Sequence, residues 1–556
     1  MSIQIGFLLL ILLIILSFSS VFRASSQPTS LPNPVNTDQQ MITYQKQSNY
    51  IHEFNVPNLK EKGLKGIVTD SDGNPWFYYQ TNKTSTLIRF NPLNHSFNSY
   101  SIQGKTVSDN SIINLAGGQL IYDEKHKSIW FTDARINALG SIDIQRGKLD
   151  IHKIPTNNSG VMGLAISPDG NSIWFAEIIG NNIGSFDIRS KTIKEYPTGE
   201  FTGPTLLAYD SNGQLWVTMS YSSSILKVEP WSLIPGSKIS GIFEIKLEKH
   251  DSFSPFGIAI ADKNKSKLFI SDHGSSRVIV SNLTSELKNY TSYWTSPSIA
   301  YPVSLPGQVV SDKNGNVYFV EHGGNKVSKL SSNGLLTEFD IPTGPLATVV
   351  YIAVSADASK VWFTEWASNK IGYLDNTVSV PLDLRIKDAM PKSLRLDQVY
   401  PLEITVNRED RVTNNSLSLN EIELSLIGMT ESGLQGLTYL ANPQRINLTD
   451  ATTIDGALNL TVGKDAIAGK YTITPRLRTF EKDNLTISLS RPQTVILDVP
   501  VEKSQLQNLP AESNQSNSNV TLIFLRDLAR YGSITVAVTL IAYLIYRKIY
   551  QRKVRP

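Results

Sequence analysis

The chain has 556 residues, enough for two to four domains at roughly 100–200 residues each. Its 52 Lys and Arg outnumber its 49 Asp and Glu, but five of the positive charges lie in the last ten residues, so the rest is close to neutral. This balance excludes a basic nucleic-acid binder, and the absence of cysteine excludes disulfide scaffolds, thiolate metal sites and a cysteine nucleophile.

The N-terminus carries an apolar run from Ile5 to Phe22, followed by Arg23 and small residues. Residues 1–26 are therefore predicted to be a signal peptide or an N-terminal anchor. The run has no preceding Lys or Arg, whereas Ala24 to Ser26 offer small residues for cleavage, so both interpretations stay open. Residues 27–49, rich in Ser, Pro and Gln, are predicted to be a linker.

Seven similar segments follow at spacings of about 42 to 54 residues. They read PWFYY at Trp76, IWFTD at Trp130, IWFAE at Trp174, LWVTM at Trp216, LFISD at Leu268, VYFVE at Tyr318 and VWFTE at Trp362. This period is typical of β-propeller blades, each built from four short antiparallel strands. The pattern predicts an all-β fold with a seven-bladed β-propeller over residues 50–377.

The seventh repeat ends after its third strand, at NKIGYLDN from Asn369. The missing fourth strand is found before the first repeat, where Ile51 to Phe54 (IHEF) matches the fourth strands IKEY and LTEF of other repeats. The N-terminal strand is therefore expected to complete the last blade, which closes the ring and leaves no unpaired edge there.

After the propeller, residues 378–502 show short segments with alternating apolar residues. These segments are LDLRI, YPLEITV, EIELSLIG, ALNLTVG, GKYTITPRL, LTISLS and TVILDVP. About seven such strands predict an immunoglobulin-like or related β-sandwich. Lys503 to Asn519 are polar, and residues 503–527 are predicted to be a flexible spacer.

Residues 528–547 contain the apolar run Tyr531 to Tyr546 and are predicted to be a C-terminal transmembrane helix, a buried core helix being the alternative. The basic tail, residues 548–556, then lies in the cytoplasm by the positive-inside rule, and the propeller and sandwich lie outside the cell membrane. Asn-x-Ser/Thr motifs agree with an extracellular glycoprotein. They occur at Asn82, Asn94, Asn157, Asn264, Asn282, Asn289, Asn414, Asn447, Asn459, Asn484, Asn514 and Asn519.

Over residues 50–377 the sequence of the repeats resembles that of the virginiamycin B lyase (streptogramin lyase) family of seven-bladed propellers. The resemblance rests on Trp362 to Glu365 (WFTE), Asn369 to Gly372 (NKIG) and Thr337 to Pro342 (TEFDIP). It implies a carbon–oxygen lyase that opens a cyclic depsipeptide antibiotic by a magnesium-dependent elimination at an ester. A histidine base and metal-associated glutamates near the propeller axis are part of that implication.

An acidic residue stands three positions after the aromatic residue in five of the seven repeats. These residues, called here the rim acids, are Asp133, Glu177, Asp272, Glu321 and Glu365. If they gather around the axis, their carboxylates repel unless a cation relieves them, and such oxygen ligands suit magnesium or calcium. The alternative is that they cap blade turns and pair with Lys326, Lys370 or backbone amides.

The histidine pattern departs from the family. In the family a Pro-His-Gly/Ala histidine stands at the top of a first strand. The matching positions here are Lys65-Gly66, Gly117-Gly118, Met162-Gly163, Gly203-Pro204, Phe256-Gly257, Pro306-Gly307 and Val350-Tyr351. The remaining candidates for a catalytic base are His273 and His322, each directly after a rim acid, because an imidazole beside a carboxylate can accept a proton near neutral pH.

Two classes of function follow. The missing histidine favours a membrane-anchored binding module that takes a small molecule, a glycan or a protein on the propeller face. The rim acids and the two histidines keep open a metal-dependent lyase or lactone- or ester-acting enzyme.

Overall fold

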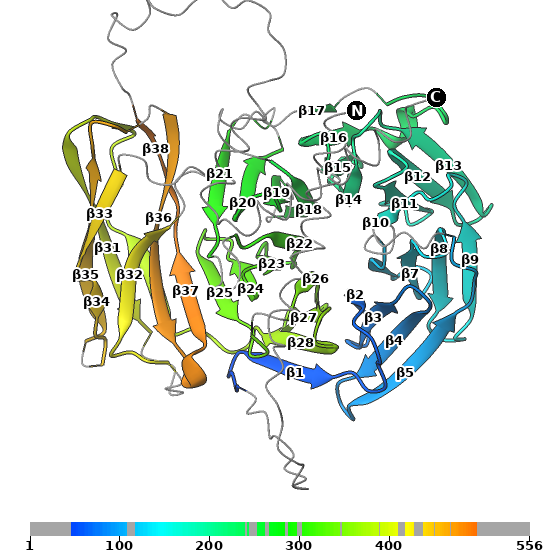
Figure 1. The fold of residues 1–556 in the computed structure, drawn as a ribbon, viewed down its shortest axis with the longest axis horizontal. Helices are drawn as coiled ribbons and strands as arrows, with labels where there is room; N and C mark the ends of the chain where they lie inside the picture. The colour runs from blue at the N-terminus through cyan, green and yellow to red at the C-terminus, as the bar shows by residue number, and fades with distance from the viewer. Residues whose placement is uncertain are drawn as a thin grey trace, which may run out of the picture. The chain divides into compact units, whose positions relative to one another are not determined.

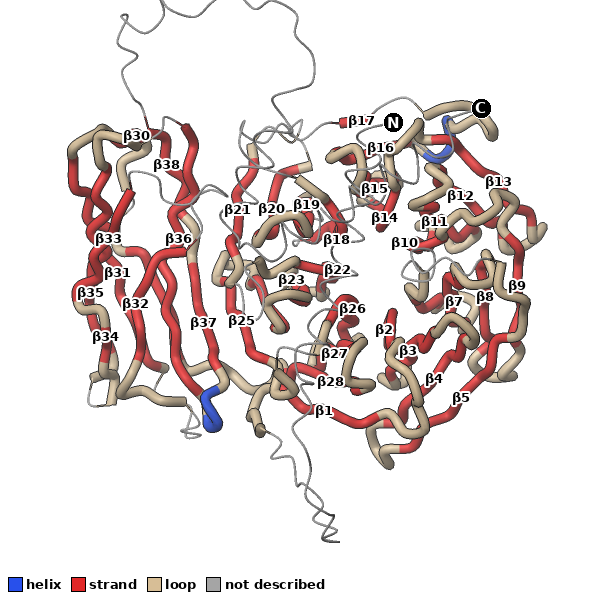
Figure 2. The backbone as a smooth tube through the Cα atoms, in the orientation of Figure 1, coloured by secondary structure: helices blue, strands red, loops and turns tan. Residues whose placement is uncertain are grey.

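The computed structural model describes residues 46–107, 117–239, 242–243, 253–261, 266–283, 287, 289–296, 303–344, 347–388, 390–409, 417–427, 437–449, 451–466 and 469–497. In these ranges the chain is almost entirely strand and turn, with two short 3-10 segments at Pro230–Ser232 and Lys482–Asn484 (Figure 2). Within the same ranges no helix is both long and apolar enough to cross a membrane. The predicted signal segment, spacer, transmembrane helix and basic tail lie outside the described residues.

Residues 51–375 form seven four-stranded antiparallel units, numbered here as blades 1 to 7. Blade 1 comprises β2 (Leu64–Thr69), β3 (Pro75–Gln80), β4 (Ser85–Asn91) and β5 (Ser96–Ile102). Blade 2 comprises β6 (Leu120–Asp123), β7 (Ser128–Asp133), β8 (Ala138–Asp143) and β9 (Leu149–Lys153). Blade 3 comprises β10 (Val161–Ile166), β11 (Ser172–Glu177), β12 (Asn182–Asp187) and β13 (Thr192–Pro197).

Blade 4 comprises β14 (Pro204–Tyr209), β15 (Leu215–Met219), β16 (Ser224–Val228) and β17 (Ile242–Phe243). Blade 5 comprises β18 (Pro255–Ala261), β19 (Lys267–Asp272), β20 (Arg277–Asn282) and β21 (Tyr290–Trp294). Blade 6 comprises β22 (Pro306–Ser311), β23 (Val317–Glu321), β24 (Lys326–Leu330) and β25 (Leu336–Asp340). Blade 7 comprises β26 (Val349–Val354), β27 (Lys360–Glu365), β28 (Lys370–Asp375) and β1 (Ile51–Asn55).

The first strand of each blade is the innermost. Figure 1 shows β2, β10, β14, β18, β22 and β26 arranged around a common centre, with the second, third and fourth strands farther out. The ends of these inner strands therefore define the mouth of the propeller axis.

Close packing between the second and third strands explains the Ile-Gly pair of the repeats. Gly184 of β12 lies opposite Phe175 of β11. A Cβ atom at Gly184 would come within 2.1 Å of the Phe175 ring, and Gly372 faces Phe363 of blade 7 in the same way at 2.4 Å. Because the aromatic ring fills the space of a side chain, only glycine fits at these positions.

The N-terminal strand closes the ring as predicted. β1 pairs antiparallel with β28, with Ile51 opposite Leu374 and Asn55 opposite Lys370. Phe54 packs against Tyr373 and Trp362 of blade 7, with ring centroids 6.1 and 6.2 Å apart. The last blade is thus assembled from the two ends of the propeller sequence, which confirms the prediction of closure.

Residues 382–497 form two further β-sheets. One has the order β29 (Leu382–Ile386), β31 (Gln398–Arg408), β35 (Thr453–Val462), β33 (Leu437–Asn442). The other contains β37 (Thr486–Ser490), β36 (Gly469–Phe480), β32 (Ile422–Ile427) and β34 (Arg445–Ile446), with β38 (Gln493–Leu497) also on β36 and paired with β30 (Ser393–Leu394). The seven alternating segments found in the sequence correspond to β29, β31, β32, β35, β36, β37 and β38.

The second of these sheets is continuous with blade 6. β25 pairs antiparallel with β37, so that Leu336 lies opposite Ser490. Thr486 donates to Asp340 from both its amide, at 3.0 Å, and its hydroxyl, at 2.7 Å. The outer edge of blade 6 is therefore covered by the C-terminal sheets, and its backbone groups find partners there.

Candidate functional site

The rim acids end the second strands of blades 2, 3, 5, 6 and 7, and all five are 0% exposed. Two of them, Asp133 and Asp272, form ion pairs with arginine. Asp272 accepts hydrogen bonds from the Ser254 amide at 2.9 Å, the Ser275 hydroxyl at 2.8 Å and Arg277 Nε at 3.0 Å. Asp133 accepts from the Ile136 amide at 3.2 Å and lies 3.7 Å from Arg135. Both aspartates therefore have partners around their own blade turns.

The other three rim acids lie beside a second glutamate, which comes from the outermost strand of the same blade. These acid pairs are Glu177 with Glu195, Glu321 with Glu338, and Glu365 with Glu53. Sequence analysis missed the outer-strand members, although each is the acid in IKEY, LTEF or IHEF. The recurrence of this glutamate in the fourth strands was the sequence signal that could have indicated the pairs.

Each outer-strand glutamate also joins two neighbouring blades. Glu195 accepts from the Thr156 amide at 2.9 Å and hydroxyl at 3.0 Å, in the segment that follows blade 2. Glu338 accepts in the same way from Ser296, which follows blade 5, at 2.7 and 3.0 Å. Glu53 accepts from the Thr343 amide, which follows blade 6, at 2.9 Å. These glutamates have a structural role at blade junctions.

Burial and mutual repulsion change the protonation of the acid pairs. Burial, with the neighbouring Glu195, raises the pKa of Glu177 to about 8. Burial and Glu53 likewise raise the pKa of Glu365 to about 8. Burial also raises the pKa of Glu321, and Glu338 adds to the effect. At neutral pH each pair therefore retains a proton.

The contacts of the rim acids are with groups of their blade turns and adjoining segments, and Asp133 also interacts with Lys65 of blade 1. Among the described residues there is no group of three or more His, Asp or Glu that could hold a metal ion. Within the part of the chain that the structure describes, the rim acids therefore show no cluster of the kind that the family resemblance implies for magnesium.

The two predicted histidines are brought together. His273 and His322 follow β19 and β23, and their ring centroids lie 5.8 Å apart. His273 Nδ1 lies 3.0 Å from the carbonyl oxygen of Pro306, at the start of β22. The ring of Phe256, at the start of β18, has its centroid 5.3 Å from that of His273. All three rings are partly exposed, at the mouth of the axis between blades 5 and 6.

The carbonyl of Pro306 fixes the tautomer of His273. A carbonyl oxygen can only accept, so Nδ1 carries the proton and Nε2 presents its lone pair. Burial lowers the pKa of His273, and it lowers the pKa of His322 to about 3 with a further contribution from His273. Both imidazoles are therefore neutral at physiological pH.

A second polar cluster lies between blades 1 and 2. Lys65 donates to Gln80 Oε1 at 3.2 Å, and burial lowers its pKa to about 7 against the opposing effect of Asp133. Gln80 Nε2 is buried there without a hydrogen-bond partner, and the buried Tyr78 hydroxyl interacts with Ser85 and Asp133. Sequence analysis noted Lys65 only as a position without histidine, because nothing in the sequence marks it as buried.

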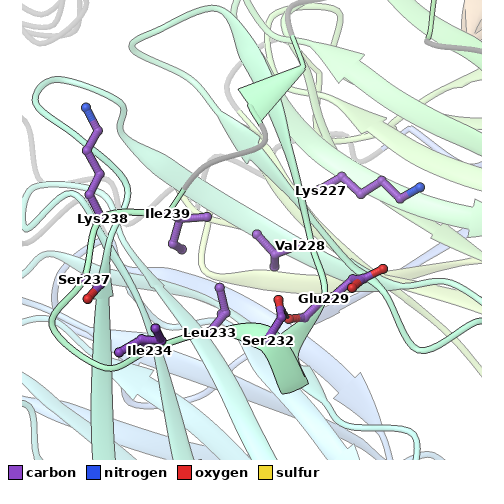
Figure 3. A pocket seen from close by; sticks show the side chains of 9 residues that line it. All are labelled: Lys227, Val228, Glu229, Ser232, Leu233, Ile234, Ser237, Lys238 and Ile239. Atoms are coloured by element: carbon purple, nitrogen blue, oxygen red, sulfur yellow. Dashed lines mark hydrogen bonds between the residues drawn. The ribbon is translucent and has the colours of Figure 1, made fainter.

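A pocket of about 360 Å³ lies on the outer part of blade 4. It is lined by Lys227, Val228, Glu229, Ser232, Leu233, Ile234, Ser237, Lys238 and Ile239. Figure 3 shows Val228, Leu233 and Ile239 near its middle, with the Lys227 and Lys238 side chains extending away from it. None of the predicted site residues lines this pocket.

Seven antiparallel blades closed by an N-terminal strand define a β-propeller, with an aromatic and histidine cluster at the mouth of its axis. Residues 36–270 match the model of the virginiamycin B lyase family, which confirms the predicted resemblance. No curated protein matches the chain.

Two solved structures illustrate the likeness. A streptogramin B lyase is 21% identical, with a TM-score of 0.48, over 59% of this chain and 97% of that one. A catalytically inactive virginiamycin B lyase from Staphylococcus aureus, solved with quinupristin, is 22% identical, with a TM-score of 0.48, over 58% of this chain and 98% of that one.

Proposed function

We propose that the propeller is a binding module whose ligand site is the His273, His322 and Phe256 cluster at the mouth of the axis. The observation that supports this most is the pairing of two partly exposed, neutral imidazoles with ring centroids 5.8 Å apart. Neutral imidazole nitrogens bind hydrogen-bond donors, and the Phe256 ring offers an apolar face. The ligand class is a small molecule or peptide-like compound with both polar and apolar groups.

Binding without chemical conversion agrees with the acid–base properties of the cluster. An imidazole with a pKa of about 3 is a weak proton acceptor, which makes His322 a poor general base at neutral pH. The rim acids are buried and accept hydrogen bonds from groups of blade turns and adjoining segments, which supports a structural role for them.

A second candidate function is an ester-eliminating lyase. It is favoured by the tautomer of His273, because Nδ1 is held by Pro306 and Nε2 carries the basic lone pair. In this version Nε2 of His273 takes a proton from the carbon next to the one that bears the ester oxygen. A carbon–carbon double bond forms between these two carbons, the carbon–oxygen bond breaks, and the carboxylate leaves. His322 and Phe256 then orient the substrate.

Quinupristin is a suitable probe, because a related structure was solved with it. Calorimetric titration of the full chain should show saturable binding, and chromatography should recover the compound unchanged. His322→Ala should weaken binding at least tenfold, whereas His126→Ala, on a blade 2 turn, should leave it unchanged. An isomeric product that is formed by the wild type and not by His273→Ala would establish the lyase instead. Unchanged quinupristin affinity in both His273→Ala and His322→Ala would refute the site.

For localisation we propose a cell-membrane protein, anchored by residues 528–547, with the propeller outside. The support is the order of apolar run and basic tail in the sequence. A protease added to intact cells should remove the propeller and spare an epitope placed after Pro556. Protection of the propeller would contradict this topology.

A further inference from the structure

The two β-sheets of residues 382–497 have edges of two kinds. The first sheet ends at β29 on one side and at β33 on the other. β29 carries a charged pair, in which Arg385 Nε lies 2.7 Å from Asp383 Oδ2. In the second sheet the strands β34 and β30 are only two residues long, and Arg445 of β34 donates to Glu421. Charge and shortness are common means by which a sheet edge avoids pairing with another chain.

β33 has neither kind of protection. Its six residues, Leu437–Asn442, include no charged residue and no proline. It pairs with β35 in one continuous register, without a bulge. In the described part of the chain no strand pairs with its other edge. The strand therefore presents backbone N–H and C=O groups along that edge, where they can pair with a further strand.

Apolar side chains of β33 are exposed beside this edge. Leu440 is 69% exposed and Tyr439 is 37% exposed. On the neighbouring strand β35, Asn459 lies opposite Leu440 and Thr461 lies opposite Thr438. Neither the edge nor the face beside it therefore carries a charge that would select an acidic or a basic partner.

The sequence of β33 is complementary to itself in antiparallel pairing. When a two-fold axis passes through Leu440, this residue lies opposite its counterpart in a second chain. Tyr439 then faces Ala441, a large ring against a small side chain. Thr438 faces Asn442, so that polar side chains meet. An axis one residue away in either direction places Leu440 opposite Thr438 or Asn442, which matches an apolar side chain with a polar one.

We propose that the protein forms a homodimer through antiparallel pairing of β33 with β33 of a second chain. The sheet β29-β31-β35-β33 then continues into its copy, and the backbone groups of both edges gain hydrogen-bond partners. A two-fold contact of this kind is closed, so it produces a dimer and no longer assembly. The proposal makes the β-sandwich a dimerisation module, and it does not depend on the ligand proposed at the axis.

The mass of the full chain in detergent, measured by light scattering, tests the dimer. The wild type should reach twice the mass of one chain as its concentration rises. Leu440→Lys places two positive charges opposite each other at the two-fold axis, so this variant should remain a monomer. Val399→Lys is the matched control, because Val399 is 59% exposed on β31 of the same sheet and lies two strands from the edge. The control should dimerise like the wild type.

Cysteine cross-linking tests the register, because the chain contains no cysteine of its own. Directly opposite residues of antiparallel strands have Cα atoms about 4.5–5.5 Å apart, which a disulfide spans. Leu440→Cys should therefore form a covalent dimer on mild oxidation. The two copies of Val399 lie five strand spacings apart in the dimer, about 24 Å, so Val399→Cys should not cross-link.

Three results would each overturn the proposal. The first is a monomeric wild type at every concentration. The second is a dimer that persists in Leu440→Lys, because it would place the contact elsewhere, such as in residues 528–547. The third is equal cross-linking of Leu440→Cys and Val399→Cys, because it would show that β33 does not form the seam.

Discussion

Blades 3 and 7 each contain a pair of neighbouring glutamates, but the two blades differ in where these glutamates lie in the sequence. In blade 3 both glutamates belong to one continuous four-stranded segment, Glu177 on β11 and Glu195 on β13. In blade 7 the outer glutamate is Glu53 on β1, whereas Glu365 lies near the other end of the propeller sequence. The same side-chain arrangement stabilises a local blade in one case and closes the whole ring in the other.

The two blades also differ in charge. Lys370 contacts Glu53 in blade 7, and blade 3 has Asn182 in that register. Loss of the outer glutamate therefore leaves a cation without its partner in blade 7, whereas in blade 3 it relieves Glu177 of a like charge. The following predictions test this difference, from the largest effect to the smallest.

Removing β1 should have the largest effect. A chain that begins at residue 56 lacks the strand that pairs with β28, so blade 7 exposes an unpaired edge and the ring opens. We expect loss of cooperative unfolding, measured by calorimetry. A chain that begins at residue 42 keeps β1 and should melt like the full chain, and equal melting of the two truncations would contradict closure.

The outer glutamates should differ in importance. Glu53→Ala removes the acceptor of the Thr343 amide and the carboxylate partner of Lys370, which keeps its bond to the Thr343 hydroxyl. We expect a loss of about 3 kcal/mol, as for a broken buried ion pair. Glu195→Ala loses only the Thr156 bonds and should cost about 1 kcal/mol. Urea unfolding measures both, and equal losses would show that Lys370 adds nothing to closure.

The fold was largely predictable because each repeat carries its own signals. The aromatic positions set the blade period, and IHEF at Ile51 to Phe54 could be matched to other fourth strands by pattern alone. The surroundings of the rim acids were not predictable in the same way. Their partners come from outer strands and from neighbouring blades, and Glu53 contacts Lys370 across 317 positions.

The histidine cluster was partly predictable. His273 and His322 were found because both follow a rim acid, and their equivalent places in adjacent blades suggested a common location. Their low basicity depends on burial, which no spacing reveals. Lys65 was missed for the same reason, since its pKa is lowered by the packing around it.

Stability should depend on pH through the acid pair of blade 7. The folded-state pKa of Glu365, about 8, lies above its ordinary value of 4.5. The stabilisation from its proton is therefore fully present below pH 4.5 and is lost as pH rises through 8. Glu365→Gln has a side chain of the same size that does not titrate. The free energy of unfolding of this variant should therefore fall by about 2 kcal/mol less over this pH range. Denaturant midpoints from pH 4 to 9 measure it, and an unchanged profile would refute the raised pKa.

The smallest contrast concerns the asparagines of the turns before the third strands. Asn181 and Asn369 both have positive φ, 55° and 56°, which glycine adopts without strain. Asn181 Oδ1 accepts from the amides of Thr202 and Gly203 at 2.9 and 3.1 Å, whereas Asn369 Oδ1 has no partner. Asn181→Gly therefore deprives two amides of their acceptor and should cost about 2 kcal/mol. Asn369→Gly loses only its bond to the Glu61 carbonyl and should cost about 0.5 kcal/mol. If both variants unfold at the same urea concentration, the side-chain bonds to the next blade contribute nothing, and the turns require these asparagines for their backbone conformation alone.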